Sequence, residues 1–303
     1  MRAIACCALA IVAACDDGPE GNQPVRSPSS SPPAAFHAPA AFTRLRLGVT
    51  PYLDAATMHK NSAPLLAYLS RELKVPVEIQ VASSYDDLAE RLRRAEIELA
   101  QFSPYAFVRA EATVRMQPLV SVIADGSATT AGYIVVRADS PYRQIQDLAG
   151  KRFAFVDPAS TSGYLYPSAV LRERGLDPAT FFAHTEFLGN HEAVLDAVFD
   201  GRFDGAATFQ GALLSLQRSK GIDPLSFRII GKTPRTPHDI FCARGDLSAE
   251  TVATLRALFL SLSVRTPEGR LILRPLNFNG FVEPLDAIFE PVRRAHTASQ
   301  SAQ

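Results

Sequence analysis

Residues 155–167 read FVDPASTSGYLYP, and they connect the end of an apolar strand to the start of an apolar helix. Three consecutive hydroxyl residues, Ser160, Thr161 and Ser162, stand at this junction and are followed by Gly163. The first N–H groups of a helix lack partners within it and carry partial positive charge. One Ser or Thr is enough to cap a helix. Three hydroxyl donors beside a glycine that permits close backbone approach therefore favour an oxyanion site.

Short apolar runs alternate with helical patterns on both sides of this junction, which predicts an α/β fold. We divide the folded body into a first lobe (43–136), a second lobe (137–236) and a return segment of the first lobe (237–296). Two crossovers, near residues 135–139 and 235–239, then join the lobes. Ligands of open α/β sheets bind beyond the carboxyl ends of the strands, so we expect the ligand cleft between the two lobes.

The N-terminal residues 1–15, MRAIACCALAIVAAC, have the composition of an export signal. One arginine precedes an apolar run that is too short to span a bilayer comfortably, and small residues then lead to Cys15. Val12–Cys15 resembles a bacterial lipobox, which predicts lipidation of Cys15; an ordinary signal peptide and an N-terminal anchor are the alternatives. Asp16 resembles the retention signal of inner-membrane lipoproteins. We therefore expect a periplasmic protein that Cys15 anchors to the inner membrane.

Both ends of the folded body are expected to be disordered. Residues 16–42 are dominated by Gly, Pro, Ser, Ala and Asn. Such a segment buries too little apolar surface to offset its ordering entropy, so it predicts a flexible linker between membrane and folded body. Residues 297–303 are predicted to form a disordered tail.

The composition excludes several classes of partner. The 31 basic and 31 acidic side chains of the 303-residue chain cancel, and no basic run is interleaved with aromatic residues, so nucleic acid is not expected to bind. The body of the chain has a single cysteine, Cys242, which cannot form an internal disulfide there and fits a small buried residue on a strand. No metal-ligand motif such as HExxH occurs, so neither a metal nor a cofactor is expected.

Residues 157–167, DPASTSGYLYP, resemble the signature of the phosphate, phosphite and phosphonate substrate-binding proteins of ABC transporters, the PhnD-like family. Four other segments share the resemblance, which covers roughly residues 44–295: GVTPYLDA at 48–55, FSPYAFV at 102–108, GNHEAVLDAVFDGRFDGAA at 189–207 and NGFVEPLDAIFEPVRRA at 279–295. The resemblance implies a type II periplasmic-binding-protein fold, a monomer, a small oxyanion ligand and a membrane permease as partner.

The resemblance also implies a set of ligand-binding residues. It places Tyr52 and Tyr105 of the first lobe at the cleft, opposite Ser160, Thr161 and Ser162 of the second. It adds His191 at the start of the helix after Gly189-Asn190. Tyrosine hydroxyls donate to oxygen while their rings exclude water, and a nearby anion favours the protonated form of a histidine.

One departure from the family pattern concerns the ligand. Relatives that take aminoalkylphosphonates hold the ammonium with two carboxylates, and Asp239 in TPHDIFCAR matches one of them. The other would fall near residues 210–212, where no acid stands, so 2-aminoethylphosphonate is disfavoured. A buried carboxylate beside an anion is costly unless a proton or cation lies between them. We therefore hypothesise that Asp239 accepts a hydrogen bond from a P–OH group or from His191.

Two other functions compete with transport. A periplasmic oxyanion sensor that reports to a membrane kinase would need the same cleft. An enzyme could use Ser160, His191 and Asp239, but no GxSxG motif presents a serine as nucleophile. Catalysis is therefore not expected, and the predicted function is capture of phosphite, phosphate or a simple phosphonate for an ABC importer.

Overall fold

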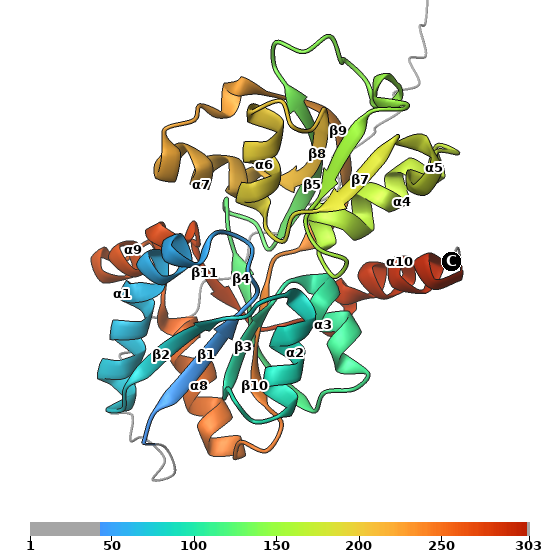
Figure 1. Cartoon of the computed structure of the whole chain (residues 1–303). Helices are drawn as coiled ribbons and strands as arrows, with labels where there is room; N and C mark the ends of the chain where they lie inside the picture. Colours follow the sequence, from blue (N-terminus) through green and yellow to red (C-terminus); the bar gives the residue numbers. More distant parts are fainter. Residues whose placement is uncertain (1–42, 302–303) are drawn as a thin grey trace, which may run out of the picture. The chain divides into compact units, whose positions relative to one another are not determined.

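The computed structural model describes residues 43–301. The predicted signal peptide (1–15), with the lipidation site Cys15, and the predicted linker (16–42) lie outside the described residues. The expected α/β fold is confirmed, since the described chain contains two mixed sheets with helices packed against them (Figure 1).

The first sheet has the strand order β11-β4-β10-β3-β1-β2. Strand β1 is parallel to β2 and β3, whereas β10 is antiparallel to β3 and β4. Its strands are β1 (Leu45–Val49), β2 (Val77–Val81), β3 (Leu99–Phe102), β4 (Met116–Ile123), β10 (Ile240–Arg244) and β11 (Gly280–Val282). The helices of this lobe are α1 (Ala55–Leu73), α2 (Tyr85–Arg93), α3 (Pro104–Glu111), α8 (Ala249–Ser261) and α9 (Pro267–Leu273).

The second sheet has the strand order β7-β6-β8-β5-β9. Its strands are β5 (Thr129–Arg137), β6 (Arg152–Phe155), β7 (His184–Phe187), β8 (Gly205–Phe209) and β9 (Phe227–Pro237). A π-helical turn, η2 (Thr161–Leu165), leads into α4 (Tyr166–Glu173). The remaining helices of this lobe are α5 (Pro178–Phe181), α6 (His191–Phe199) and α7 (Gln210–Lys220).

The first crossover between the lobes corrects the predicted boundary. Strand β5 pairs with β8 and β9 of the second sheet, so the chain changes lobe at residues 124–128 and not at residues 135–139. An apolar strand has the same pattern in either sheet, and only its pairing partners decide which lobe it joins. The second crossover, between β9 and β10, falls within the predicted range 235–239.

The C-terminal end of the described chain is also more ordered than predicted. The sequence predicts disorder from residue 297, but helix α10 (Glu290–Ser301) continues to Ser301. Contacts with α3 hold it: Arg293 forms an ion pair with Glu111 at 2.7 Å, and His296 Nδ1 lies 3.2 Å from the Tyr105 hydroxyl. The sequence pattern of the tail carries no sign of these partners, because they are nearly 200 residues away.

Local sequence signals account for where the helices begin. Asp54, Ser84, Ser103, Asn190 and Ser248 each accept a hydrogen bond from a backbone N–H of the first helical turn. These are the residue types that satisfy the unpaired N–H groups of a helix start. Four short 3-10 turns complete the chain: η1 (Ile145–Leu148), η3 (Pro224–Ser226), η4 (Arg274–Leu276) and η5 (Asp286–Phe289).

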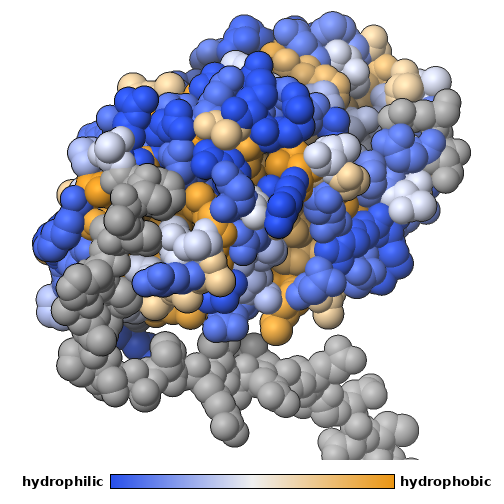
Figure 2. Space-filling model, turned by 90° about the horizontal axis from the view of Figure 1, so that it is seen from below, coloured by the Kyte–Doolittle hydropathy of each residue, from blue (hydrophilic) through white to orange (hydrophobic). Residues whose placement is uncertain are grey.

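Apolar residues form the core, and polar residues cover most of the surface. Cys242 on β10 is fully buried and free, as the sequence predicts. Seen from below, the surface is mainly hydrophilic, with smaller hydrophobic areas between the polar residues (Figure 2). None of the helices within residues 43–301 combines the length and the apolarity needed to cross a bilayer.

Candidate functional site

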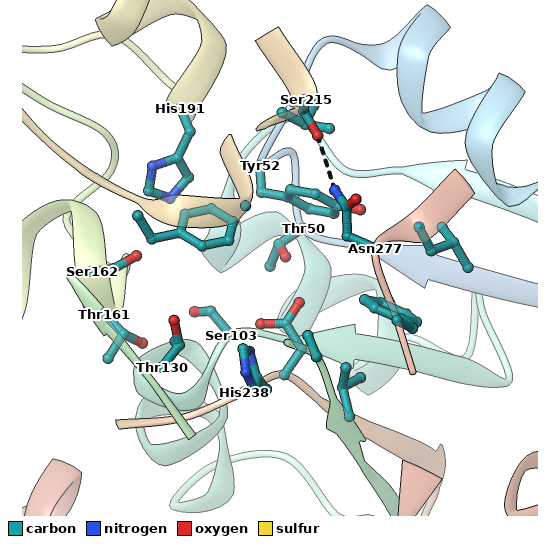
Figure 3. A pocket seen from close by; sticks show the side chains of 18 of the residues that line it. Thr50, Tyr52, Ser103, Thr130, Thr161, Ser162, His191, Ser215, His238 and Asn277 are labelled. Atoms are coloured by element: carbon teal, nitrogen blue, oxygen red, sulfur yellow. Dashed lines mark hydrogen bonds between the residues drawn. The ribbon is translucent and has the colours of Figure 1, made fainter. Parts of the chain in front are cut away.

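A cavity of about 90 Å³ lies where the predicted cleft was expected, and residues of both lobes line it. Pockets for drug-sized ligands measure roughly 300–1,000 Å³, so this cavity favours a smaller molecule. Its polar lining residues are Thr50, Tyr52, Asn61, Tyr85, Ser103, Asp125, Thr130, Ser160, Thr161, Ser162, His191, Ser215, His238, Asp239 and Asn277. Figure 3 shows the hydroxyl groups of Ser103, Thr130, Thr161 and Ser162 gathered on one side of it.

The three hydroxyl residues after β6 have three different surroundings. Ser160 Oγ accepts a hydrogen bond from the Gly163 N–H at 3.1 Å and so caps the helical segment that follows. Thr161 Oγ1 accepts from the Tyr105 N–H of the first lobe at 2.8 Å. Ser162 is half-buried, and its hydroxyl points into the cavity (Figure 3). A hydroxyl oxygen that accepts a backbone N–H keeps its own proton to donate, so Thr161 and Ser160 each retain a proton, although the Ser160 hydroxyl also has a hydrogen bond with Tyr85. Ser162 can donate without such a constraint.

The first lobe contributes the ends of its parallel strands. Thr50 follows the last residue of β1, and Ser103 follows the last residue of β3 and caps α3. Tyr52, two residues after Thr50, also lines the cavity. Tyr52 is among the predicted site residues, whereas Thr50 and Ser103 are not, although the rule that ligands bind at the carboxyl ends of strands indicates both of them. Tyr85 and Thr130 carry no comparable signal.

Tyr105 corrects the predicted site. Its side chain is not among the residues that line the cavity. Its ring instead packs against that of His296, with 5.5 Å between the ring centroids, and its hydroxyl lies 3.2 Å from the His296 Nδ1. The Tyr105 backbone N–H, and not its hydroxyl, reaches the other lobe, because the side chain leaves α3 on the face that α10 covers.

His191 opens α6 at the cavity, as predicted, but its electrostatic environment differs from the expectation. The ring is buried, and its Nδ1 lies 3.2 Å from the Thr208 hydroxyl. Burial lowers the pKa of His191 to about 3, so the imidazole is neutral near pH 7. A neutral ring that accepts from Thr208 at Nδ1 carries its proton on Nε2 and can still donate to an anion. The His191 N–H donates to the Tyr52 carbonyl at 3.0 Å and joins the two lobes.

Asp239 lines the cavity from the crossover between β9 and β10. Its Oδ2 accepts a hydrogen bond from Gln101 Nε2 at 2.8 Å. Burial raises the pKa of Asp239 to about 6, and the Gln101 hydrogen bond opposes part of that shift. The His191 ring forms its hydrogen bond with Thr208, so the structure does not support the hypothesis that His191 donates to Asp239. The hypothesis for this carboxyl is therefore that it accepts a hydrogen bond from a P–OH group of the ligand.

The positive electrostatic character of the cavity comes from partial charges and not from charged side chains. Among the described residues, no lysine or arginine lines it. The helices α3 and α6 and the helical segment that starts at Thr161 instead begin beside it, and helix N-termini carry partial positive charge. His238 also lines the cavity, and burial lowers its pKa to about 4. Within residues 43–301 no group of His, Cys, Asp and Glu side chains is arranged to hold a metal ion.

Comparison with known proteins identifies the family and supports the fold. Residues 47–289 match the family described as ABC transporter, phosphonate, periplasmic substrate-binding protein. The chain is 29% identical to the phosphate-import protein PhnD of Mycolicibacterium smegmatis over 71% of this chain and 70% of the relative. It is 26% identical to the phosphonates-binding periplasmic protein of Escherichia coli over 85% of this chain and 77% of the relative.

Solved structures share the fold. A binding-protein component of an ABC phosphonate transporter from Pseudomonas aeruginosa superposes with a TM-score of 0.79 at 22% identity, covering 85% of this chain and 86% of that one. PhnD1 from Prochlorococcus marinus, in complex with methylphosphonate, gives a TM-score of 0.76 at 21% identity, covering 85% and 98% of the two chains. The expected type II periplasmic-binding-protein fold is confirmed.

The raised pKa of Asp239 predicts a pH-dependent stability. The ordinary pKa is 3.8 and the folded value is about 6. The folded protein therefore keeps its full free energy of unfolding below about pH 4, where the carboxyl is neutral, and loses part of it as the pH rises through about 6 and the buried carboxyl ionises. The loss amounts to at most about 3 kcal/mol. We expect the Asp239→Asn variant to be more stable than the parent protein at pH 7.5 and equally stable near pH 4.

Urea unfolding of the ligand-free protein at the two pH values checks this prediction. The lowered pKa values of His191 and His238 make both proteins more stable as the pH rises, which is opposite to the effect of Asp239. Because this contribution is the same in variant and parent, the difference in stability between them reports on Asp239. A stability difference that is the same at pH 4 and pH 7.5 would contradict it.

Proposed function

The chain belongs to the family of periplasmic substrate-binding proteins of phosphonate ABC transporters, and from this premise we propose that it captures a small phosphorus oxyanion for an importer. The observation that carries the proposal is the set of hydroxyl donors at Ser160, Thr161 and Ser162, two of which are oriented by backbone N–H groups. Phosphite, phosphate and simple phosphonates each present the three oxygens that such a cradle can bind.

The hydrogen-bond partners of the three candidate catalytic side chains favour ligand binding over catalysis. Ser160 Oγ caps a helix, His191 Nδ1 contacts Thr208, and Asp239 pairs with Gln101. A nucleophilic serine needs a base within hydrogen-bond reach and a third group that orients that base. Each of the three side chains is held by a different neighbour, which suits a rigid receptor.

We further propose that the protein is a monomeric, periplasmic lipoprotein whose cavity delivers its ligand to a membrane permease. The lipobox-like Val12–Cys15 and the adjacent Asp16 support an inner-membrane anchor at Cys15. We expect the Cys15→Ala variant to lose incorporation of labelled palmitate and to appear in the soluble fraction. Labelling of the variant at the parent level would contradict the anchor.

The cradle itself can be tested with one substitution. The Ser162→Ala change removes a donor that points into the cavity, and hydrogen bonds to charged groups contribute about 1.5–3 kcal/mol. We expect methylphosphonate and phosphite to bind about 10–150-fold more weakly to Ser162→Ala by isothermal titration calorimetry. The melting temperature of the ligand-free protein should change little, because the Ser162 hydroxyl caps no helix.

Two controls accompany this measurement. Ser226→Ala, on η3 and outside the cavity lining, should bind like the parent protein. A strain that lacks the gene and carries Ser162→Ala should take up the anion slowly if the protein serves an importer. Normal uptake with a lost transcriptional response would instead support the sensor function. Parent-like affinity of Ser162→Ala would contradict the cradle.

Asp239 gives the binding reaction a pH dependence. If its carboxylate accepts a hydrogen bond from a P–OH group, the protein binds the monoprotonated anion, and affinity for phosphate and phosphite falls as the pH rises above the last pKa of the ligand. The Asp239→Asn variant carries an amide that can donate to a fully ionised oxygen, so its affinity should depend less on pH. Calorimetry between pH 5.5 and 8.5 measures both slopes. A flat parent profile or an unchanged variant would contradict the shared proton.

A further inference from the structure

A second cavity, separate from the proposed oxyanion site, is lined by residues of α1 in the first lobe and of α6 and α7 in the second. The charged groups that line it are Asp54 at the start of α1, Glu192 and Asp196 on α6, and Lys220 at the end of α7. Three acids and one lysine leave an excess of negative charge when all four are ionised. The proposed function gives none of these side chains a role.

Glu192 is the most buried of the four. Its side chain is only 5% exposed, and its Oε1 lies 3.1 Å from the Lys220 ammonium and accepts from the Ser219 hydroxyl at 3.4 Å. Among the described residues, no donor reaches its other oxygen, Oε2, which is also buried. A buried carboxylate oxygen without a hydrogen-bond donor costs free energy. The Glu192 carboxyl is therefore only half satisfied in its ionised form.

The carboxyl group of Asp54, from the other lobe, lies within hydrogen-bond reach of the Glu192 carboxyl. The Asp54 Oδ1 also accepts from the Thr57 N–H at 3.0 Å and so caps α1. Two ionised carboxylates repel each other and cannot hydrogen-bond, because each of them only accepts. No group of acids within residues 43–301 is arranged to hold a metal ion. A single shared proton is the partner that turns this contact into a hydrogen bond.

The carboxyl pair adjoins the proposed oxyanion site in the sequence on both lobes. His191 precedes Glu192, Tyr52 lies two residues before Asp54, and both His191 and Tyr52 line the oxyanion cavity. The His191 N–H donates to the Tyr52 carbonyl at 3.0 Å, which holds the two chain segments together beside the pair. A movement that separates the lobes at the oxyanion cavity therefore separates the two carboxyl groups as well.

We propose that Asp54 and Glu192 form a proton-dependent latch between the lobes. Glu192 takes up one proton from solvent when the lobes close, donates it in a hydrogen bond to the ionised Asp54, and returns it to solvent when the lobes open. The inference rests on the proposed function in one respect, because it assumes that ligand binding closes the lobes. It adds a group outside the oxyanion cavity that couples this closure to pH.

The electrostatics of the pair place the proton on Glu192. Burial, and then the contact with Asp54, raise the pKa of Glu192 above its ordinary value of 4.5, and Lys220 opposes part of this shift. Burial alone would raise the pKa of Asp54, but hydrogen bonds from Thr57 and Glu192 outweigh it and lower that pKa. The latch therefore stabilises the closed form fully below about pH 4.5. This stabilisation is lost as the pH rises through the raised pKa of Glu192.

Counting the protons that accompany ligand binding tests the latch. Calorimetry with methylphosphonate, in buffers of different ionisation enthalpy, gives the number of protons taken up. The contributions of the ligand and of Asp239 are the same in the parent protein and in Glu192→Gln, whose amide donates to Asp54 without a titrating proton. We expect the parent to take up a larger fraction of a proton than Glu192→Gln between pH 5 and pH 7.

The affinities should differ between these two proteins in a pH-dependent way. Near pH 4.5 they should be nearly equal, because both proteins then have a donor between the two lobes. At pH 8 the variant should bind methylphosphonate more tightly, by about tenfold for each unit by which closure raises the pKa of Glu192. An equal proton count, or an affinity difference that does not change with pH, would overturn the latch.

Two further variants serve as a second test and a control. Asp54→Asn keeps a residue that caps a helix, and it should also lose the additional proton uptake. Glu173→Gln removes an exposed acid of α4 that lies outside this cavity, so its proton count and affinity should match those of the parent. Retained methylphosphonate binding shows that each variant is folded. A parent-like proton count in Asp54→Asn would overturn the pairing of the two carboxyls.

A measurement without ligand separates this inference from the proposed function. If no phosphorus oxyanion binds, the proposed function fails, and small-angle X-ray scattering of the ligand-free proteins decides the latch. The latch predicts that the radius of gyration decreases from pH 8 to pH 5 by more in the parent than in Glu192→Gln. An equal change in both proteins, or no change in either, would overturn it. If methylphosphonate binds with equal proton counts in both proteins, only the latch is refuted.

Discussion

The hydrogen bond from the Tyr105 N–H to Thr161 Oγ1, at 2.8 Å, joins the start of α3 to the start of the helical segment after β6. Because the threonine oxygen is occupied as an acceptor, its proton is available to a third group. The Ser160 hydroxyl oxygen is likewise occupied as an acceptor, by the Gly163 N–H. The backbone of the protein therefore orients these hydroxyl groups before any ligand binds. Such pre-organisation lowers the entropic cost of binding.

The cavity is lined by dipoles and not by full positive charges, and this composition has consequences for the selectivity of the proposed anion binding. Helix starts, hydroxyl groups and a neutral His191 supply donors, whereas lysine and arginine are missing from the described lining. A site with full positive charges would attract any small anion of sufficient charge. A site of fixed donors, with one carboxyl whose pKa is raised to about 6, responds to the geometry and the protonation state of the ligand.

The sequence predicts the local features of this protein well and the long-range ones poorly. The alternation of strands and helices and the hydroxyl junction at 160–162 depend on neighbouring residues, and both are found in the structure. The position of β5 depends on its pairing with β8 and β9, so the first crossover is mispredicted. Tyr105 is misplaced because α10 covers its side chain. The hydrogen-bond partner of Asp239 is Gln101, which lies 138 residues earlier in the chain, so no local sequence pattern predicts that contact.

Cys242 has a consequence for protein chemistry. It is the single cysteine between residue 43 and the C-terminus, it is fully buried on β10, and burial raises the pKa of its thiol. A buried, protonated thiol reacts slowly with electrophiles. The folded body is therefore already suited to site-selective labelling. One engineered cysteine on each lobe would accept a pair of fluorescent dyes without replacement of the native residue, and the separation of the lobes would become an optical signal.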